Sequence, residues 1–338
     1  MHARTALSGQ SQLRTNVARP VRAPSATSRS RLAVMAHASR RANDSDKLAL
    51  VNKVECFIFD CDGVIWRGDS VIDGVPETLE LLRNMGKRLF FVTNNSTKSR
   101  AGYLNKFTSL GLQVTAEEIY SSSYAAAAYL HSIDFKKKVY VIGEEGIQQE
   151  LDLKGIQHFG GPADADKKVV LKAGELLTHD PEVGAVVVGF DRHINYYKIQ
   201  YATLCIRENP GCMFIATNRD AVTHLTDAQE WAGNGSMVGA IVGSTKREPH
   251  VVGKPSEFML EDIAQSLGLQ PSQICMVGDR LDTDIMFGKN GGLTTCLVLS
   301  GVTTEETLTS PSNSIHPDLY MDQLSELLSI KDQAAVLA

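Results

Sequence analysis

Short apolar runs separated by helical patterns characterise the chain from residue 54 onwards. Seven runs rich in Val, Ile, Phe and Leu end at a glycine or at polar residues: 54–59, 89–92, 139–142, 185–188, 213–216, 274–277 and 295–299. Continuous apolar runs of this length are typical of strands buried on both faces of a parallel sheet. Between them, 76–84 and 256–267 carry apolar residues at helical spacing, and a glycine follows each as a stop signal. The alternation predicts an α/β fold with a doubly wound, Rossmann-like parallel sheet.

Polar clusters follow several of these apolar runs. They are Asp60-Cys61-Asp62-Gly63, Thr93-Asn94-Asn95, Lys254-Pro255, and the stretch from Gly278-Asp279 to Asp284. In a doubly wound sheet, ligands bind at the carboxyl ends of the strands. We therefore expect these carboxylates, the hydroxyl, the lysine and the glycines to converge on one crevice.

The content of that crevice indicates phosphoryl chemistry on a metal. Carboxylates at this density repel one another, so a cation is implied, and Mg²⁺ prefers a few carboxylate oxygens together with substrate phosphate. A lysine and a hydroxyl beside the metal would spread phosphoryl charge. Asp60 can attack phosphorus and Asp62 can move protons, because residues i and i+2 of an extended chain point to the same side.

Together the four clusters resemble, in order, the motifs of the haloacid dehalogenase superfamily. The resemblance implies Asp60 as nucleophile and metal ligand, and Asp62 as general acid/base with its backbone carbonyl on Mg²⁺. It implies Thr93, with the Asn94 backbone, as the phosphoryl site, and Lys254 as the residue that holds nucleophile and phosphate. Asp279 would be the third protein ligand to the metal, and Asp284 would support it. An Asp at position 62 favours phosphatases and phosphomutases over the ATPase branch.

Spacing predicts a second domain between the second and third motifs. We expect core segments at 50–135 and 247–335, and a compact α/β cap of the C2 type at 136–246. The insertion resembles the branch that includes 4-nitrophenylphosphatase-like enzymes. Within it, 186–191 and 214–220 are most similar to eukaryotic phosphoglycolate phosphatases, which implies hydrolysis of phosphoglycolate, the two-carbon product handled in photorespiration. That substrate has a second negative charge, so Arg219, His193 and His224, with Asn218 as a neutral donor, are candidate cap contacts.

The N-terminus differs in charge from the rest of the chain. Residues 1–43 contain eight arginines, many serines and no Asp, Glu or Lys. This composition is typical of an organelle transit peptide, here predicted at about residues 1–36 for the chloroplast stroma, with the mitochondrion or an attached disordered tail as alternatives. The acidic remainder argues against nucleic acid as a partner, and the apolar runs are too short to cross a membrane.

Several functions compete for the same site. A related phosphatase of pyridoxal phosphate or of broad specificity would prefer apolar or stacking groups in the cap, and a phosphomutase would need a bisphosphate activator. A non-catalytic phosphate sensor should have lost one of the four principal motif residues, whereas Asp60, Asp62, Lys254 and Asp279 are all present. The resemblance further implies a homodimer. Redox control through Cys61, between two acidic residues, is left open.

Overall fold

The computed structural model describes residues 39–170, 172–226 and 229–334. The predicted transit peptide at 1–36 lies outside the described residues. Arg40–Arg41 form strand β1, which pairs in parallel with β16 (Leu319–Met321). The Asn43 side chain accepts a hydrogen bond from the Asp46 N–H and caps helix α1 (Asp44–Lys53). Residues 40–43 therefore belong to the described fold, although they continue the acid-free composition of the segment before them.

A seven-stranded sheet carries the motif residues. Its order is β1-β16-β15-β14-β2-β5-β6, and every neighbouring pair is parallel. The remaining strands are β2 (Cys56–Phe59), β5 (Arg88–Thr93), β6 (Ile119–Ser121), β14 (Ile274–Gly278) and β15 (Thr294–Val298). The apolar runs at 54–59, 89–92, 274–277 and 295–299 thus form adjacent strands, and β2 lies between β5 and β14.

Helices cover both faces of this sheet. Phe57 and Phe59 contribute to one hydrophobic cluster, and their neighbours Cys56 and Ile58 contribute to another, because successive side chains of a strand point to opposite faces. The first cluster includes residues of α1, α2 (Val75–Asn84) and α3 (Arg100–Ser109). The second includes residues of α4 (Ser122–Ser132), α8 (Glu257–Leu267) and α9 (Met286–Asn290). Two further helices, α10 (Glu305–Thr309) and α11 (Lys331–Ala334), follow near the C-terminus. The doubly wound fold predicted from the alternating pattern is confirmed.

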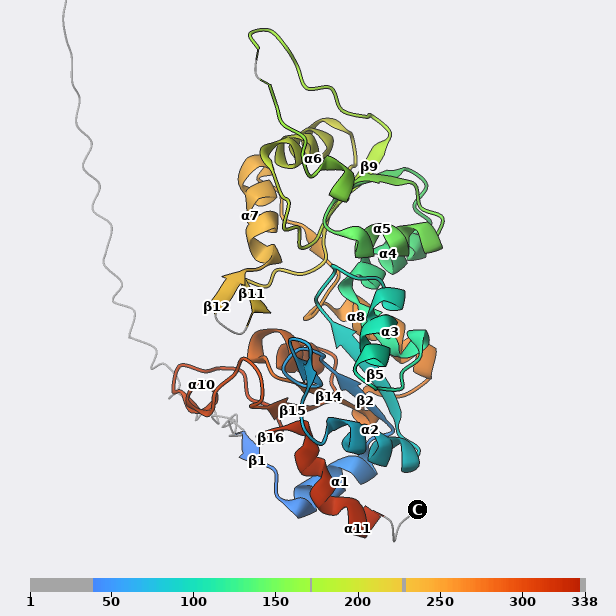
Figure 1. The fold of residues 1–338 in the computed structure, drawn as a ribbon, viewed down its shortest axis with the longest axis vertical. Coiled ribbons are helices and arrows are strands. Elements are labelled where there is room, and N and C mark those ends of the chain that lie inside the picture. Colours follow the sequence, from blue (N-terminus) through green and yellow to red (C-terminus); the bar gives the residue numbers. More distant parts are fainter. Residues whose placement is uncertain (1–38, 171, 227–228, 335–338) are drawn as a thin grey trace, which may run out of the picture. The chain divides into compact units, whose positions relative to one another are not determined.

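A second, five-stranded parallel sheet is inserted between β6 and β14 (Figure 1). Its order is β13-β10-β9-β7-β8, with β7 (Lys138–Ile142), β8 (His158–Gly160), β9 (Val183–Val188), β10 (Met213–Ala216) and β13 (His250–Val251). On one face of this sheet, residues of α6 (Tyr196–Glu208) and α7 (Asn234–Thr245) form a third hydrophobic cluster with its strands. Residues of α5 (Glu145–Leu153) and the alternate side chains of these strands belong to the second cluster described above. Strand β13 extends this sheet beyond residue 246, the predicted end of the cap.

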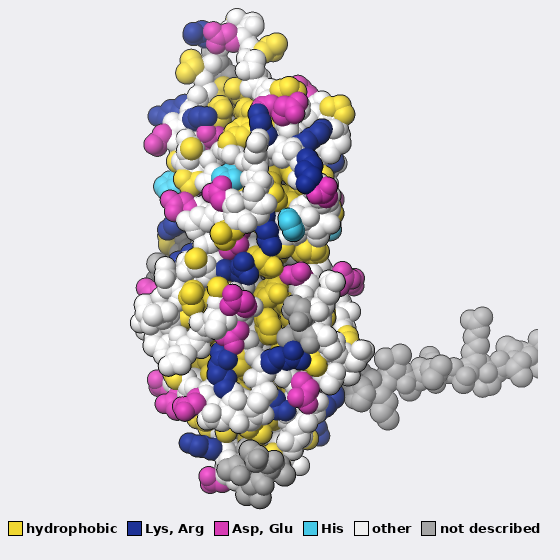
Figure 2. Space-filling view, turned by 90° about the vertical axis from the view of Figure 1, so that its right-hand side faces the viewer, with side chains coloured by type: hydrophobic (Ala, Val, Ile, Leu, Met, Phe, Trp, Pro, Cys, Tyr) yellow, Lys and Arg dark blue, Asp and Glu magenta, His cyan; other side chains and the backbone are white. Residues whose placement is uncertain are grey.

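Two hairpins project from these sheets: β3 (Trp66–Arg67) with β4 (Ser70–Val71), and β11 (Val222–Thr226) with β12 (Gln229–Ala232). The first forms a flap directly after the Asp60 motif. Among the described residues, no helix is both long and apolar enough to cross a membrane. On the face shown in Figure 2, acidic and basic side chains of the described residues are interspersed, and neither sign forms a continuous surface.

Candidate active site

Asp60 and Lys254 form the centre of the site. Asp60 follows β2 directly, and its N–H donates to the carbonyl oxygen of Val277 in β14 at 2.9 Å. Lys254 is buried, and its ammonium donates a short hydrogen bond to Asp60 Oδ1, with a second bond to the Val92 carbonyl at 3.0 Å. Burial disfavours the Lys254 ammonium, but attraction by Asp284 and Asp60 outweighs burial and raises the pKa of Lys254. Lys254 is therefore a fixed cation beside the Asp60 carboxyl group.

Asp284 organises the loop after β14. Its Oδ1 lies 2.8 Å from Lys254 Nζ. Its Oδ2 accepts hydrogen bonds from the backbone N–H groups of Asp279 at 3.1 Å and Arg280 at 3.0 Å. Through these contacts the Asp284 carboxylate fixes both the lysine and the backbone that carries Asp279.

Asp279 lies in a tight backbone cradle. Its Oδ2 accepts the Val302 N–H at 2.6 Å, whereas its Oδ1 is buried and has no hydrogen-bond partner. A Cβ atom on Gly63, which has φ of +82°, would lie 2.7 Å from Asp279 Oδ2, and one on Gly301 would lie 1.9 Å away. Glycine is required at both positions because the backbone approaches the carboxylate so closely.

This arrangement fits a bound cation. Carboxylate oxygens of Asp60, Asp279 and Asp284 all lie within 4.8 Å of one another. Burial, together with repulsion from neighbouring carboxylates, raises the pKa of both Asp60 and Asp279. Three buried acids face one buried lysine, and Asp279 Oδ1 has no donor. A divalent cation would supply both the missing partner and the missing positive charge.

Asp62 and Thr93 lie beside this cluster in different environments. Asp62 is exposed, unlike the buried Asp60, and its Oδ1 accepts a hydrogen bond from the indole Nε1–H of Trp66 at 2.9 Å. Thr93 ends β5 with 2% of its surface exposed, and its Oγ1 accepts the Asn95 N–H at 3.2 Å. The structure thus brings together all the motif residues that the sequence predicted.

Asn94 links the core site to the inserted domain. Its Nδ2 donates to the Lys254 carbonyl at 3.0 Å and to Asp220 Oδ1 at 3.1 Å. Its backbone carbonyl accepts from Asn218 Nδ2 at 2.6 Å. Burial raises the pKa of Asp220, against the attraction of Arg280. Sequence reasoning missed Asp220, although its place two residues after Asn218, just beyond β10, was a usable signal.

The cap residues that were predicted to contact the substrate carboxylate lie in different environments. Arg219 Nη1 pairs with Glu248 Oε2 at 2.6 Å, and both side chains are about half exposed or more, at 49% and 67%. His193 is exposed in the turn after β9. The side chain of His224 lies outside the described part of the chain. Of the three cap candidates whose side chains the structure describes, Asn218 alone has a hydrogen bond to a motif residue, the Asn94 carbonyl.

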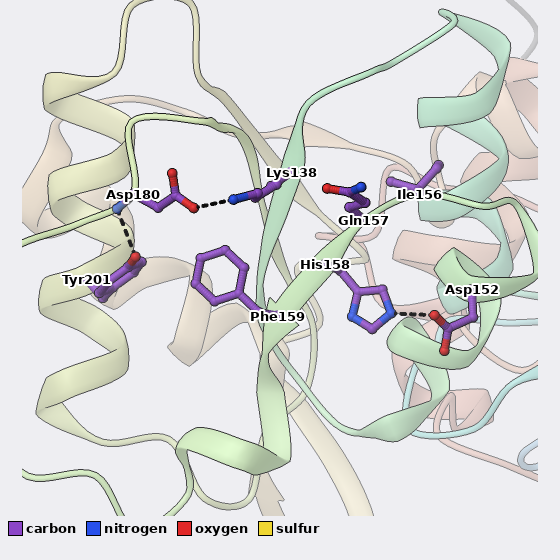
Figure 3. Close-up of a pocket in the computed structure, with 8 residues that line it drawn as sticks. All are labelled: Lys138, Asp152, Ile156, Gln157, His158, Phe159, Asp180 and Tyr201. Carbon is purple, nitrogen blue, oxygen red and sulfur yellow. Dashed lines mark hydrogen bonds and ion pairs between the residues drawn. The ribbon is translucent and has the colours of Figure 1, made fainter.

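A separate pocket of about 600 Å³ opens on the five-stranded sheet and contains none of the motif residues. Its lining comes from β7, β8, α5 and α6 and from the loops that precede β8 and β9 (Figure 3). Its charged groups are already paired, Lys138 with Asp180 at 2.7 Å and His158 with Asp152 at 2.9 Å (Figure 3). The carboxylates and the lysine that the sequence predicted thus lie in the crevice and not among the residues that line this pocket.

Comparison with known proteins agrees with the fold and the crevice. Residues 57–157 match the family described as haloacid dehalogenase-like hydrolase, and residues 251–327 match one described as HAD-hydrolase-like. The first match runs from β2 through β7 and α5 of the inserted domain, the second begins at the end of β13, and together they include every motif residue. The chain belongs to the haloacid dehalogenase-like hydrolases.

Individual proteins within this family are similar to the chain over most of its length. Phosphoglycolate phosphatase 1A, chloroplastic, from Arabidopsis thaliana is 66% identical over 88% of this chain and 82% of its own length. Phosphoglycolate phosphatase 2 from the same plant is 56% identical over 86% of this chain and 97% of its own. Among solved structures, p-nitrophenyl phosphatase from Archaeoglobus fulgidus is 34% identical and superposes with a TM-score of 0.71, covering 82% of this chain and 99% of that one. The core with its inserted cap is thus shared with known phosphatases.

Proposed function

We propose that this protein hydrolyses 2-phosphoglycolate to glycolate and phosphate through an aspartyl-phosphate on Asp60. The observation that carries the chemistry is the buried Asp60 carboxyl group, held by Lys254, next to the exposed carboxyl group of Asp62. The choice of substrate is supported by 66% identity to a chloroplastic phosphoglycolate phosphatase.

In the first half-reaction, an Asp60 oxygen attacks phosphorus and the bond between phosphorus and the glycolate oxygen breaks. Asp62, which is exposed, gives its proton to that oxygen as glycolate leaves. Lys254, the Thr93 hydroxyl and the Asn94 backbone hold the phosphoryl oxygens.

In the second half-reaction, water attacks the phosphorus of the aspartyl-phosphate. The ionised Asp62 takes the water proton, and the bond from phosphorus to the Asp60 oxygen breaks, which releases phosphate and restores both carboxyl groups. An acid that donates in one step and accepts in the next returns to its starting state after each turnover.

Mg²⁺ is the proposed cofactor, held by Asp60, Asp279 and the backbone carbonyl of Asp62, with Asp284 in support through its bonds to the Asp279 loop. When bound, it would neutralise the carboxylates and the charge of the phosphoryl oxygens. The buried Asp279 Oδ1, without a hydrogen-bond partner, supports this assignment.

The proposal extends to the domains, the location and the assembly of the protein, and similarity to chloroplastic relatives supports the location. We place the core at 39–137 and 252–334 and the cap at 138–251, with the cap closing over a small phosphorylated metabolite. We assign the protein to photorespiration in the chloroplast stroma, with a transit peptide near 1–36, and expect a homodimer. Fusion of residues 1–36 to a fluorescent protein tests the address, and light scattering of the purified protein tests the dimer.

The experiment that tests the activity compares kcat/KM, with Mg²⁺, for phosphoglycolate, pyridoxal phosphate, 4-nitrophenyl phosphate and glycerol phosphate. We expect phosphoglycolate to be strongly preferred, and all turnover to be lost in Asp60→Asn. Similar rates across the panel would favour the second candidate, a broad-specificity enzyme resembling the p-nitrophenyl phosphatase of similar fold. Turnover that persists in pure Asp60→Asn protein would overturn the proposed mechanism.

A further inference from the structure

Trp66 makes a contact with the reaction centre that the motif roles do not explain. The residue is fully buried in the flap strand β3, four positions after Asp62, and its indole Nε1–H donates to Asp62 Oδ1 at 2.9 Å. The intervening loop closes on itself, because the Gly63 N–H donates to the Trp66 carbonyl at 2.8 Å and the Trp66 N–H donates to the Cys61 carbonyl at 3.2 Å. Backbone and side chain together fix the indole relative to Asp62.

Helix α3 holds the other side of the ring. Phe107 meets the indole edge-to-face, with ring centroids 4.8 Å apart. Lys106 Nζ lies 4.5 Å from the ring centroid and also donates to the Gly68 carbonyl of the flap at 3.0 Å. Because residues of both the flap and α3 contact the indole, the direction of its N–H bond is fixed.

A role in packing explains the ring contacts but not the direction of the N–H. A buried indole N–H needs an acceptor, and a backbone carbonyl would serve that need. Here the acceptor is the carboxylate of an exposed residue, Asp62, two positions after Asp60. A hydrogen bond to a carboxylate is also stronger than one to a neutral acceptor.

We propose that Trp66 is a positioning residue, whose indole N–H orients the Asp62 carboxyl group for proton transfer to the leaving group. The indole N–H is a donor only, and because a carbonyl oxygen is a better acceptor than a carboxyl hydroxyl, this bond favours the proton of neutral Asp62 on Oδ2. Oδ2 then gives that proton to the leaving oxygen as the bond from phosphorus to that oxygen breaks and the bond from Asp60 to phosphorus forms. This inference rests on the proposed function, since it needs Asp62 as the general acid.

The leaving group provides the test. Glycolate leaves as a basic alkoxide unless it is protonated, whereas 4-nitrophenolate is a stable anion and needs little help. Single-turnover reactions with Mg²⁺ and enzyme in excess measure this cleavage step alone. In Trp66→Phe, which keeps an aromatic ring but removes the N–H, glycolate release should slow by about tenfold or more, while nitrophenolate release should change by less than about twofold.

Two further variants separate positioning from damage to the fold. Trp66→3-benzothienylalanine keeps the bicyclic ring without the N–H and should reproduce the selective loss even if Trp66→Phe lowers thermal stability. The matched control is Tyr140→Phe, which removes a buried O–H that donates to Asp164 Oδ2 at 2.8 Å in the cap, and both its rates should stay unchanged.

Equal slowing with both substrates, or no slowing with either, would overturn the role of Trp66. If the wild-type protein cleaves 4-nitrophenyl phosphate but not phosphoglycolate, the substrate assignment fails. The comparison is then made with glycerol phosphate, another alkyl ester, and a selective loss with it still supports the role of Trp66. A wild-type protein that cleaves none of these esters overturns both proposals.

Discussion

Asp279→Asn should make the metal-free protein more stable and the magnesium-loaded protein less stable than wild type. The substitution keeps the shape of the side chain, so the amide oxygen can still accept the Val302 N–H. The new Nδ2 then lies where Asp279 Oδ1 had no partner, and it can donate to the nearby acids. One change therefore removes both a buried charge and a metal ligand.

The magnitudes follow from the geometry. Two carboxylates within 4.8 Å of each other repel by roughly 3 kcal/mol at the effective dielectric constant of about 20 that suits protein sites. Lys254 offsets part of this repulsion, so we expect the metal-free variant to gain about 1–2 kcal/mol in free energy of unfolding. In wild type, Mg²⁺ at a hundred times its Kd should add about 2.7 kcal/mol, or a Tm rise of about 5 °C.

Thermal unfolding in EDTA and across a magnesium titration measures both effects. Asp282→Asn is the matched control, since it makes the same chemical change three residues away on a side chain that is 66% exposed and paired with Arg280. It should leave the magnesium response intact. A wild-type magnesium response in Asp279→Asn, or a metal-free Asp279→Asn protein less stable than wild type, would refute the assignment of Asp279 as a ligand.

Two further substitutions and one thiol-modification experiment test the site. Lys254→Arg should lower kcat by about a hundredfold or more, because the buried ammonium is held by Asp60, Asp284 and a backbone carbonyl, and a planar guanidinium does not reproduce that set of hydrogen bonds. Steady-state kinetics on folded protein measure the effect, and a near-normal kcat would contradict the role of Lys254. Arg219→Ala should change KM for phosphoglycolate by less than about twofold, because Arg219 pairs with Glu248 at the surface. A tenfold rise in KM would indicate that Arg219 contacts the substrate. Ellman's reagent should react with none of the six cysteines until the protein is denatured, since all are buried and burial, followed by the charges of Asp60 and Asp62, raises the pKa of the Cys61 thiol. A fast-reacting thiol in the native protein would reopen redox control.

Local pattern was sufficient for the long strands and for the motif residues. Runs such as 54–59 and 274–277 carry their own signal, because a strand buried on both faces needs an uninterrupted apolar stretch. The short edge strands β8 and β13 were missed, since two or three residues show no periodicity and their pairing depends on neighbours already in place. The start of the folded chain carries no such signal, because the arginines at positions 40 and 41 resemble the basic segment before them although they pair with β16.

The sequence by itself determined which groups meet at the crevice, because parallel strands bring their carboxyl ends to one edge regardless of the details of packing. Only the tertiary structure decided how those groups are used. It pairs Arg219 with Glu248 at the surface, directs the indole of Trp66 at Asp62, and brings Asp220 to Asn94. Such choices depend on side-chain directions and on contacts between residues up to 126 positions apart, and no local pattern of polar and apolar positions records them.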